Sequence, residues 1–212
     1  MEGHYPIVLG LSNRPCLVIG GGPVAETKVS GLLAVGARVT VVSPTLTPRL
    51  DSWARERRLR HLPREYRAPD LDGHALVFVA TGERSVDEAV AREGRARGVW
   101  VNAADNPDHC DFILPSVLRR GRLVVAVSTG GASPALARAI REQLEGYFTE
   151  EYAALVELAA EVREELRARA GASGAEAWRG AFDGELRRLL ADGRREEAKA
   201  YLRDHVGGRL WA

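Results

Sequence analysis

The sequence predicts an α/β fold in which a parallel sheet, covered by helices on both faces, precedes a β-hairpin and a helical tail. Strand-like apolar segments alternate with helical segments between residues 16 and 103, which is the pattern of parallel β-α-β units. The apolar segments 112–118 and 123–127 flank the turn sequence Arg119-Arg-Gly-Arg122, which predicts a hairpin. From residue 149 onward the chain is rich in Ala, Leu, Glu and Arg, which is typical of helices.

The elements of the parallel region can be placed from their apolar runs and end signals. Gly36 is expected to end the first helix, because glycine favours the position that follows a helix. Ser85 is expected to cap the third helix, because its hydroxyl can accept a hydrogen bond from a free N–H. We expect strands at 5–11, 17–19, 39–42, 59–62, 75–80 and 99–102, and helices at 24–35, 50–58 and 85–97.

The turn after the first strong strand carries the spacing Gly20-x-Gly22-x-x-Ala25. This is the dinucleotide-binding fingerprint of a Rossmann-type sheet. Gly20 would permit a tight turn, Gly22 would let backbone approach a pyrophosphate, and Ala25 would let the helix pack on the strand. The alternative is an ordinary strand–helix turn. The residues expected to contact the dinucleotide here are Gly20, Gly21, Gly22, Pro23 and Val24.

Three more residues stand where strands of this sheet are expected to end, and open parallel sheets bind ligands at that edge. They are Ser43, Thr81 and Asn102, and we expect each to contact the cofactor. A dinucleotide fold usually has an acidic residue at the position of Ser43, to bind the ribose. A serine can bind a hydroxyl or a phosphate oxygen, so the sequence leaves the choice between NAD and NADP open.

The segment Asn102–Asp111 contains the candidate proton acceptors. An acid such as Asp105, just beyond a strand end, could accept a proton while a hydride leaves for a nicotinamide. His109 is the rival base, because histidine titrates nearer neutrality; a simple turn at Asp105 is the other reading. His109, Cys110 and Asp111 are metal-ligand types, but adjacent loop residues rarely share one ion, so we expect no bound metal.

A second glycine-rich loop, Ser128–Pro134, leads into a predicted helix at 134–148. Ser133 suits the N-cap and Pro134 the first helical position. Free N–H groups at such a helix start could bind an anion. Residues 113–145 also carry five arginines against two glutamates. By themselves, these features favour a capped helix with a solvated basic face over a binding site.

Composition limits the classes of function. The chain has 212 residues and a net charge of +1, with 45% hydrophobic and 28% charged residues, as in ordinary globular domains. The balanced charge gives no general attraction to nucleic acid. Its two cysteines, Cys16 and Cys110, lack the spacing of a redox or zinc motif. No apolar run approaches the roughly 20 residues of a membrane span. We therefore expect a cytoplasmic protein without membrane or nucleic-acid partners.

Taken together, three stretches resemble the precorrin-2 dehydrogenase family: GGGPVAETK at 20–28, NAADNPDHCDFILPS at 102–116 and VSTGGASPALAR at 127–138. Members of this family oxidise precorrin-2 to sirohydrochlorin with NAD on the route to siroheme. They also form the front module of siroheme synthases, often with ferrochelatase activity. The resemblance implies an NAD-binding Rossmann domain at 1–112, a dimerisation segment at 113–148 and a helical domain at 149–212.

The resemblance also implies roles for particular residues. It assigns the catalytic aspartate to Asp105 and the cofactor glycines to Gly20, Gly21 and Gly22. Because precorrin-2 bears eight carboxylates, arginines are expected around it. The expected substrate-binding residues are Ser128, Gly130, Gly131, Arg119, Arg120, Arg138 and His109. The expected partners are precorrin-2, a second copy of the chain in a homodimer and, for a chelatase, ferrous ion as substrate.

Two other classes of protein compete with this one. A non-catalytic dinucleotide-sensing module would keep the Gly20–Ala25 loop but would need neither the hairpin nor the second glycine loop. A short-chain dehydrogenase would need a Tyr-x-x-x-Lys pair, and no tyrosine of the chain has lysine four residues on. The sequence therefore favours the tetrapyrrole dehydrogenase, with the sensing module as the alternative.

Overall fold

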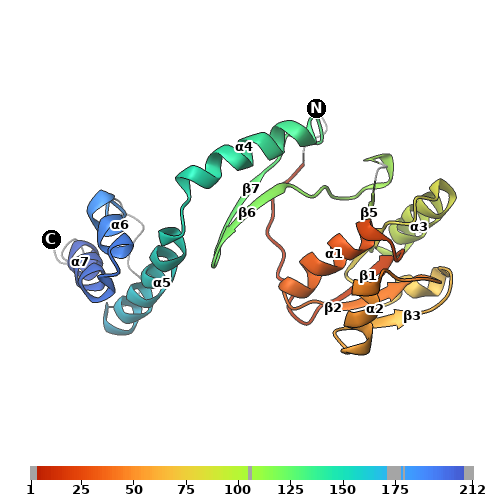
Figure 1. Cartoon of the computed structure of the whole chain (residues 1–212), viewed down its shortest axis with the longest axis horizontal. Coiled ribbons are helices and arrows are strands. Elements are labelled where there is room, and N and C mark those ends of the chain that lie inside the picture. The colour runs from red at the N-terminus through yellow and green to blue at the C-terminus, as the bar shows by residue number, and fades with distance from the viewer. Residues whose placement is uncertain (1–3, 105–106, 171–177, 179, 208–212) are drawn as a thin grey trace. The chain divides into compact units, whose positions relative to one another are not determined.

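The computed structural model of the chain (Figure 1) describes residues 4–104, 107–170, 178 and 180–207. Its contacts divide the chain into two compact units, Met1–Leu114 and Pro115–Ala212. No helix among the described residues is long and apolar enough to cross a membrane. Each unit is described on its own below.

The first unit contains a five-stranded parallel sheet of order β3-β2-β1-β4-β5. The chain builds outward from β1 to β3, then returns to the centre and continues with β4 and β5. This reversal places a switch point between β1 and β4, where α/β sheets bind ligands. The strands are β1 (Pro15–Ile19), β2 (Arg38–Val42), β3 (Leu59–Leu62), β4 (Leu76–Val79) and β5 (Trp100–Ala103).

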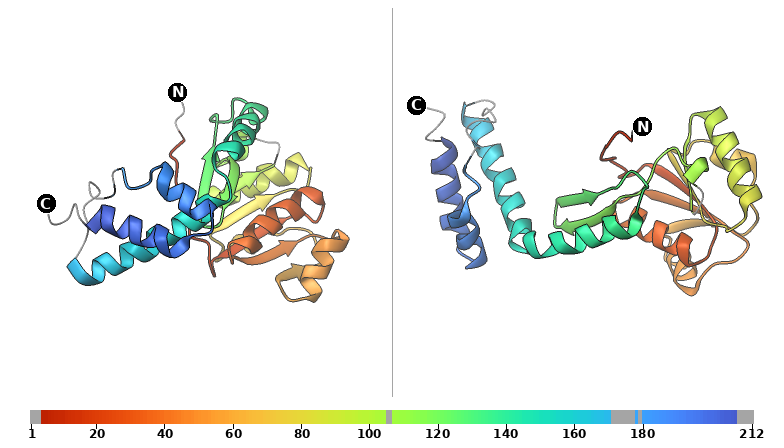
Figure 2. Two further views of the ribbon diagram at one scale, coloured as in Figure 1. Left: turned by 60° about the vertical axis from the view of Figure 1, so that its left-hand side comes forward. Right: turned by 90° about the horizontal axis from the view of Figure 1, so that it is seen from above.

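Helices cover both faces of this sheet because neighbouring residues of each strand point to opposite faces. Cys16 and Val18 of β1 pack with α1 (Pro23–Ala34) and α2 (Pro48–Arg55). Leu17 and Ile19 pack on the other face, with α3 (Arg84–Arg97) and η1 (Ala68–Leu71). Figure 2 shows α1 and α3 on opposite sides of the sheet. The predicted parallel sheet with two covered faces is confirmed.

The second unit begins with the antiparallel hairpin of β6 (Ser116–Arg120) and β7 (Leu123–Val127), against which α4 (Pro134–Tyr147) packs. As expected, Ser133 is the N-cap of α4, and its hydroxyl accepts a hydrogen bond from the N–H of Leu136 at 3.2 Å. The predicted hairpin and its following helix are confirmed.

Among the described residues, three further helices of the second unit share their own apolar core. They are α5 (Glu151–Ala170), α6 (Gly184–Ala191) and α7 (Arg195–Gly207). Leu158, Leu186 and Leu202 are fully buried in this core. The helical character expected from residue 149 is therefore confirmed for the described part of this tail. The expected division at residues 112 and 148 stays a prediction.

Two local predictions are wrong. Residues 5–11 form no strand, and Tyr5 and Val8 are 87% and 89% exposed. An apolar run becomes a strand only where a sheet edge receives it, and within the described chain none does. Ser85 lies inside α3 rather than at its N-cap, which is Glu83. The helix begins earlier because the hydroxyl of Thr81 accepts the N–H of Glu83 at 3.1 Å and turns the chain there.

Candidate functional site

The carboxyl ends of the parallel strands bring most of the predicted cofactor residues to one edge of the sheet. Ile19 of β1 lies beside Val42 of β2 and Val79 of β4. Gly20 and Ser43 therefore leave the sheet side by side. Asn102 lies within β5, whose last residues pair with the end of β4.

Gly20 and Gly21 are required by the packing of the protein itself. Gly20 has φ = +118°, and a Cβ there would overlap the carbonyl oxygen of Ala80. A Cβ at Gly21 would overlap the carbonyl oxygen of Thr45 and lie 2.7 Å from Oγ of Ser43. The turn after β1 therefore packs closely between the loops that follow β2 and β4. Only glycine lets these three loops meet so closely.

Gly22 differs from its two neighbours because it faces open space. A Cβ built on Gly22 would have nothing within 4 Å. Gly22 is the N-cap of α1, with extended backbone (φ −85°, ψ −173°), and Pro23 follows it in the first turn. The first N–H groups of a helix lack partners inside the helix and attract anions. We call this open start of α1 at Gly22 the cradle, and its shape and donors fit a dinucleotide pyrophosphate.

Ala25, the third small residue of the fingerprint, is fully buried against the sheet. The next residue, Glu26, ties α1 to the loop after β2. Its carboxylate accepts a hydrogen bond from the hydroxyl of Thr47 at 2.6 Å and lies 3.7 Å from the guanidinium of Arg49. Nothing in the sequence singles out Glu26 or Thr47, because their contact joins residues far apart in the chain.

Ser43 takes the place of the acidic residue that usually binds the ribose, and it is 7% exposed. Its hydroxyl donates to the carbonyl oxygen of Thr45 at 2.7 Å, and its own carbonyl lies 2.9 Å from Nε2 of His61. The donor of Ser43 is thus used to shape the loop beside Gly21. The hydroxyl oxygen of Ser43 can still accept a hydrogen bond from a ribose hydroxyl.

Asn102 and Asp111 fasten the loop that follows β5. The amide of Asn102, 8% exposed, donates to the carbonyl oxygen of Phe112 at 2.9 Å. Asp111 accepts the backbone N–H of Val101 at 2.8 Å. Cys110 donates to the carbonyl of Ala103 at 3.2 Å, and burial raises the pKa of its thiol. Among the described residues no group of three or more His, Cys, Asp or Glu could hold a metal ion.

Both candidate bases come from the sequence segment between Asn102 and Asp111. Asp105 lies outside the described residues. His109 ends η2 (Pro107–His109), and its Nδ1 is buried without a hydrogen-bond partner in the described part of the chain. A buried ring nitrogen without a partner is costly, so a bound ligand is a natural partner for it.

The other substrate candidates lie in the second unit. The hydroxyl of Ser128 accepts the N–H of Gly130 at 3.1 Å, and Gly130 and Gly131 have φ of +65° and +87°. A Cβ on either glycine would meet nothing within 4 Å, so this loop is open around its backbone. Two left-handed residues in succession require glycine, which explains the pair in the sequence.

The three candidate arginines are in different situations. Arg120 is part of the fold, because its Nε donates to the carbonyl of Phe148 at 2.9 Å and its side chain is 19% exposed. Arg138 pairs with Glu142 along α4 at 2.8 Å. Arg119 is exposed and forms no ion pair with another described residue. Arg119 is therefore the candidate with a guanidinium available to a ligand.

The sheet order, the switch point and the cradle at Gly22 define a Rossmann-type dinucleotide-binding unit joined to a hairpin and helices. A family model described as "Putative NAD(P)-binding" matches residues 7–116, and one described as "Sirohaem biosynthesis protein central" matches residues 120–147. The chain belongs to this NAD(P)-binding family. The expected class of cofactor is thereby confirmed.

Similar proteins point to one biosynthetic context. The siroheme synthase of Methylobacillus flagellatus is 42% identical over 96% of this chain and 44% of its own length. That of Methylococcus capsulatus is 38% identical over 94% of this chain and 42% of its own length. The chain thus spans less than half the length of these relatives. The solved structure of SirC, a precorrin-2 dehydrogenase, matches with a TM-score of 0.75 and 29% identity, over 94% of this chain and 98% of that chain.

Proposed function

We propose that this chain oxidises precorrin-2 to sirohydrochlorin, with NAD as the hydride acceptor, in the biosynthesis of siroheme. The observation that carries the proposal is the match to SirC, which extends over 98% of that dehydrogenase. The likeness therefore includes the hairpin and the helices as well as the nucleotide-binding unit. A sensing module is not favoured, because the similar proteins are biosynthetic enzymes and both parts that it would not need are present.

Bound NAD would supply the acceptor for the hydride. The chain's own part is to hold the pyrophosphate at the cradle, with the free N–H groups of α1 and no side chain at Gly22 to obstruct it. The loops at Gly20 and Ala80, locked against each other, fix the position of this cradle relative to the sheet. We assign the proton that leaves precorrin-2 to Asp105, with His109 as the alternative base.

Precorrin-2 carboxylates need cationic partners, and Arg119 is the arginine that we assign to them. Arg138 would have to leave Glu142 first, and Arg120 is needed within its own unit. We also assign the open loop at Ser128, Gly130 and Gly131 to the substrate, since its backbone can approach a carboxylate closely. Insertion of ferrous ion into the product is a second activity that this chain could perform with the same residues.

We further propose a two-fold homodimer built from residues 113–148. Large apolar side chains are exposed there just before the hairpin, on the hairpin and on α4, where a partner copy could bury them. They are Leu114 (50% exposed), Val117 (37%), Val124 (36%), Leu136 (52%) and Tyr147 (61%).

The direct test mixes the protein with precorrin-2 and NAD and follows the absorbance change to sirohydrochlorin. Ferrous ion added afterwards tests for chelation. We expect Asp105→Asn to keep NAD binding and to lose at least about 100-fold in rate, the usual contribution of a general base. Near-normal turnover in Asp105→Asn, with loss of turnover in His109→Ala, would assign the base to His109 instead.

A further inference from the structure

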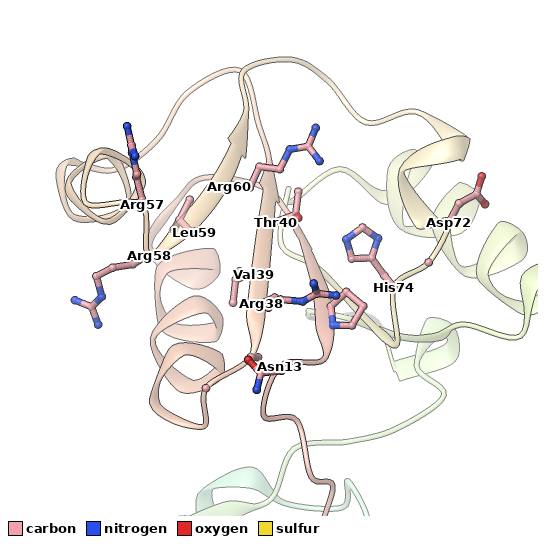
Figure 3. A pocket seen from close by; sticks show the side chains of 14 residues that line it. Asn13, Arg38, Val39, Thr40, Arg57, Arg58, Leu59, Arg60, Asp72 and His74 are labelled. Carbon is pink, nitrogen blue, oxygen red and sulfur yellow. The ribbon is translucent and has the colours of Figure 1, made fainter.

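A hollow of about 610 Å³ lies on the first unit (Figure 3). It is at the amino-terminal edge of the parallel sheet, opposite the edge that carries the cradle. Its lining comes from the amino-terminal parts of β1, β2 and β3 and from the turn before β4, including Pro15, Arg38, Leu59 and His74. Volumes of about 300–1,000 Å³ are typical of small-molecule sites. Nothing in the proposed dehydrogenase chemistry uses this edge.

The hollow exists because one crossover of the sheet is short. The chain passes from β3 to β4 through η1, a 3₁₀ helix of 4 residues, where a full helix would cover the sheet. Leu17, Thr40 and Arg60 lie in register across β1, β2 and β3. Leu17 is buried in the core beneath α3 and η1, whereas Arg60 is exposed. The layer formed by α3 and η1 on this face of the sheet therefore ends near β2.

Positive charge dominates the lining of the hollow. Four arginines line it, at positions 38, 57, 58 and 60, against a single acid, Asp72. Asp72 already pairs with Arg97 at 3.1 Å. Arg58 lies 3.7 Å from Glu56. The other three arginines form no ion pair with any described residue.

The side chains of Arg38, Thr40 and Arg60 lie on one side of β2 and β3 (Figure 3). Figure 3 shows Arg38, Thr40 and Arg60 along that side, with His74 facing them, while Arg57 and Arg58 lie on the other side of β3. With strands about 4.8 Å apart and a rise of about 3.3 Å per residue, the Cα atoms of Arg38 and Arg60 lie about 8 Å apart. Two arginine side chains at that spacing can reach one ligand from both ends.

We propose that this hollow binds a small oxyanion with two negative charges, a phosphate or a dicarboxylate, between Arg38 and Arg60. Planar guanidinium groups match both kinds of oxyanion. Thr40 lies directly across from Arg60 and two residues after Arg38, so its hydroxyl can add a donor, and an imidazole N–H of His74 can complete the set. Binding also relieves the repulsion among arginines that have no acidic partner.

Isothermal titration with phosphate and with succinate, at constant ionic strength, tests the site. We expect saturable binding of at least one anion, and the tighter of the two identifies the ligand class. Loss of a charged hydrogen bond should weaken it about tenfold in Arg38→Gln and in Arg60→Gln. Arg92→Gln is the matched control, because Arg92 is a 73% exposed arginine elsewhere in the same unit.

The cradle also attracts phosphate, so each titration is repeated in a Gly22→Asp background, where the hollow should still bind. Absence of saturable binding by both anions, or equal binding in Arg60→Gln and the parent protein, overturns the proposal. Because the readout is binding rather than turnover, the result does not depend on the dehydrogenase assignment.

Discussion

The substitution Gly22→Asp separates cofactor binding from folding at the start of α1. The backbone of Gly22 is extended, at φ −85° and ψ −173°, which any residue can adopt. A Cβ there meets nothing within 4 Å. Aspartate is moreover a better N-cap than glycine, by a few tenths of a kcal/mol. The variant should therefore melt at the same temperature as the parent protein or slightly higher.

Dinucleotide binding should respond quite differently. The carboxylate introduced by Gly22→Asp, about 5 Å from one pyrophosphate charge at an effective dielectric constant of about 20, costs about 3 kcal/mol in repulsion. That free energy corresponds to a loss of affinity of more than about 100-fold. Gly22→Asn is the matched control, because asparagine has nearly the same shape and capping ability without the charge. We expect Gly22→Asn to bind NAD more weakly than the parent and clearly more tightly than Gly22→Asp.

The assay is a titration of NAD monitored by calorimetry, together with thermal unfolding of each variant. Affinity equal to that of the parent in a folded Gly22→Asp protein would refute the cradle as the pyrophosphate site. Equal losses in the aspartate and asparagine variants would show that shape alone, without charge, governs the site.

Three further predictions concern packing, acid stability and assembly. Gly21→Ala should destabilise the first unit by about 1–3 kcal/mol, the usual cost of overpacking, because its Cβ overlaps the carbonyl of Thr45; Gly31→Ala, at an open position of α1, should be neutral or stabilising in the same urea titration. Arg64 lowers the pKa of Asp70, so this pair should add stability above the ordinary carboxyl pKa of about 3.9 and lose it as the pH falls through the lower folded value. Asp70→Asn should accordingly flatten the decline of unfolding free energy below about pH 4, and an unchanged acid profile would contradict this. Leu136→Arg, at a 52% exposed position on α4, should shift the mass measured by light scattering at micromolar concentration from dimer to monomer. If the parent protein itself has the mass of a monomer, the dimer proposal is wrong.

The sheet and the cradle could be predicted because their signals are local. The run Leu17–Ile19 is apolar on both faces. The small residues Gly20, Gly22 and Ala25 each indicate a position where a larger side chain would obstruct the turn, the ligand or the packing of the helix. Burial of Ala25 and the open space at Gly22 agree with those separate requirements. A strand prediction failed at residues 5–11, because an apolar run does not reveal whether a neighbouring strand will receive it.

The individual polar contacts could not be predicted, because they depend on which atoms the fold brings together. The sequence predicts that Ser43, Asn102 and Arg120 face ligands, yet each makes hydrogen bonds within the protein. A hydroxyl, an amide or a guanidinium has the same chemistry in either role. The sequence states the type of group at each position, and only the tertiary structure shows how much of its hydrogen-bonding capacity remains.

The strand β2 connects the two ligand sites of the first unit, because one of its ends lies at the hollow and the other at the cofactor edge. Its length decides whether a ligand at one site can affect binding at the other. Arg38 begins the strand at the hollow, and Ser43 follows its last residue at the cradle edge. A strand of five residues spans about 16 Å at about 3.3 Å per residue, so one small anion cannot touch both. Val39, Val41 and Val42 are buried between these ends, in a strand paired on both sides, and coupling between two sites needs an element with two arrangements. An anion in the hollow should therefore stabilise the first unit while leaving its affinity for NAD nearly unchanged.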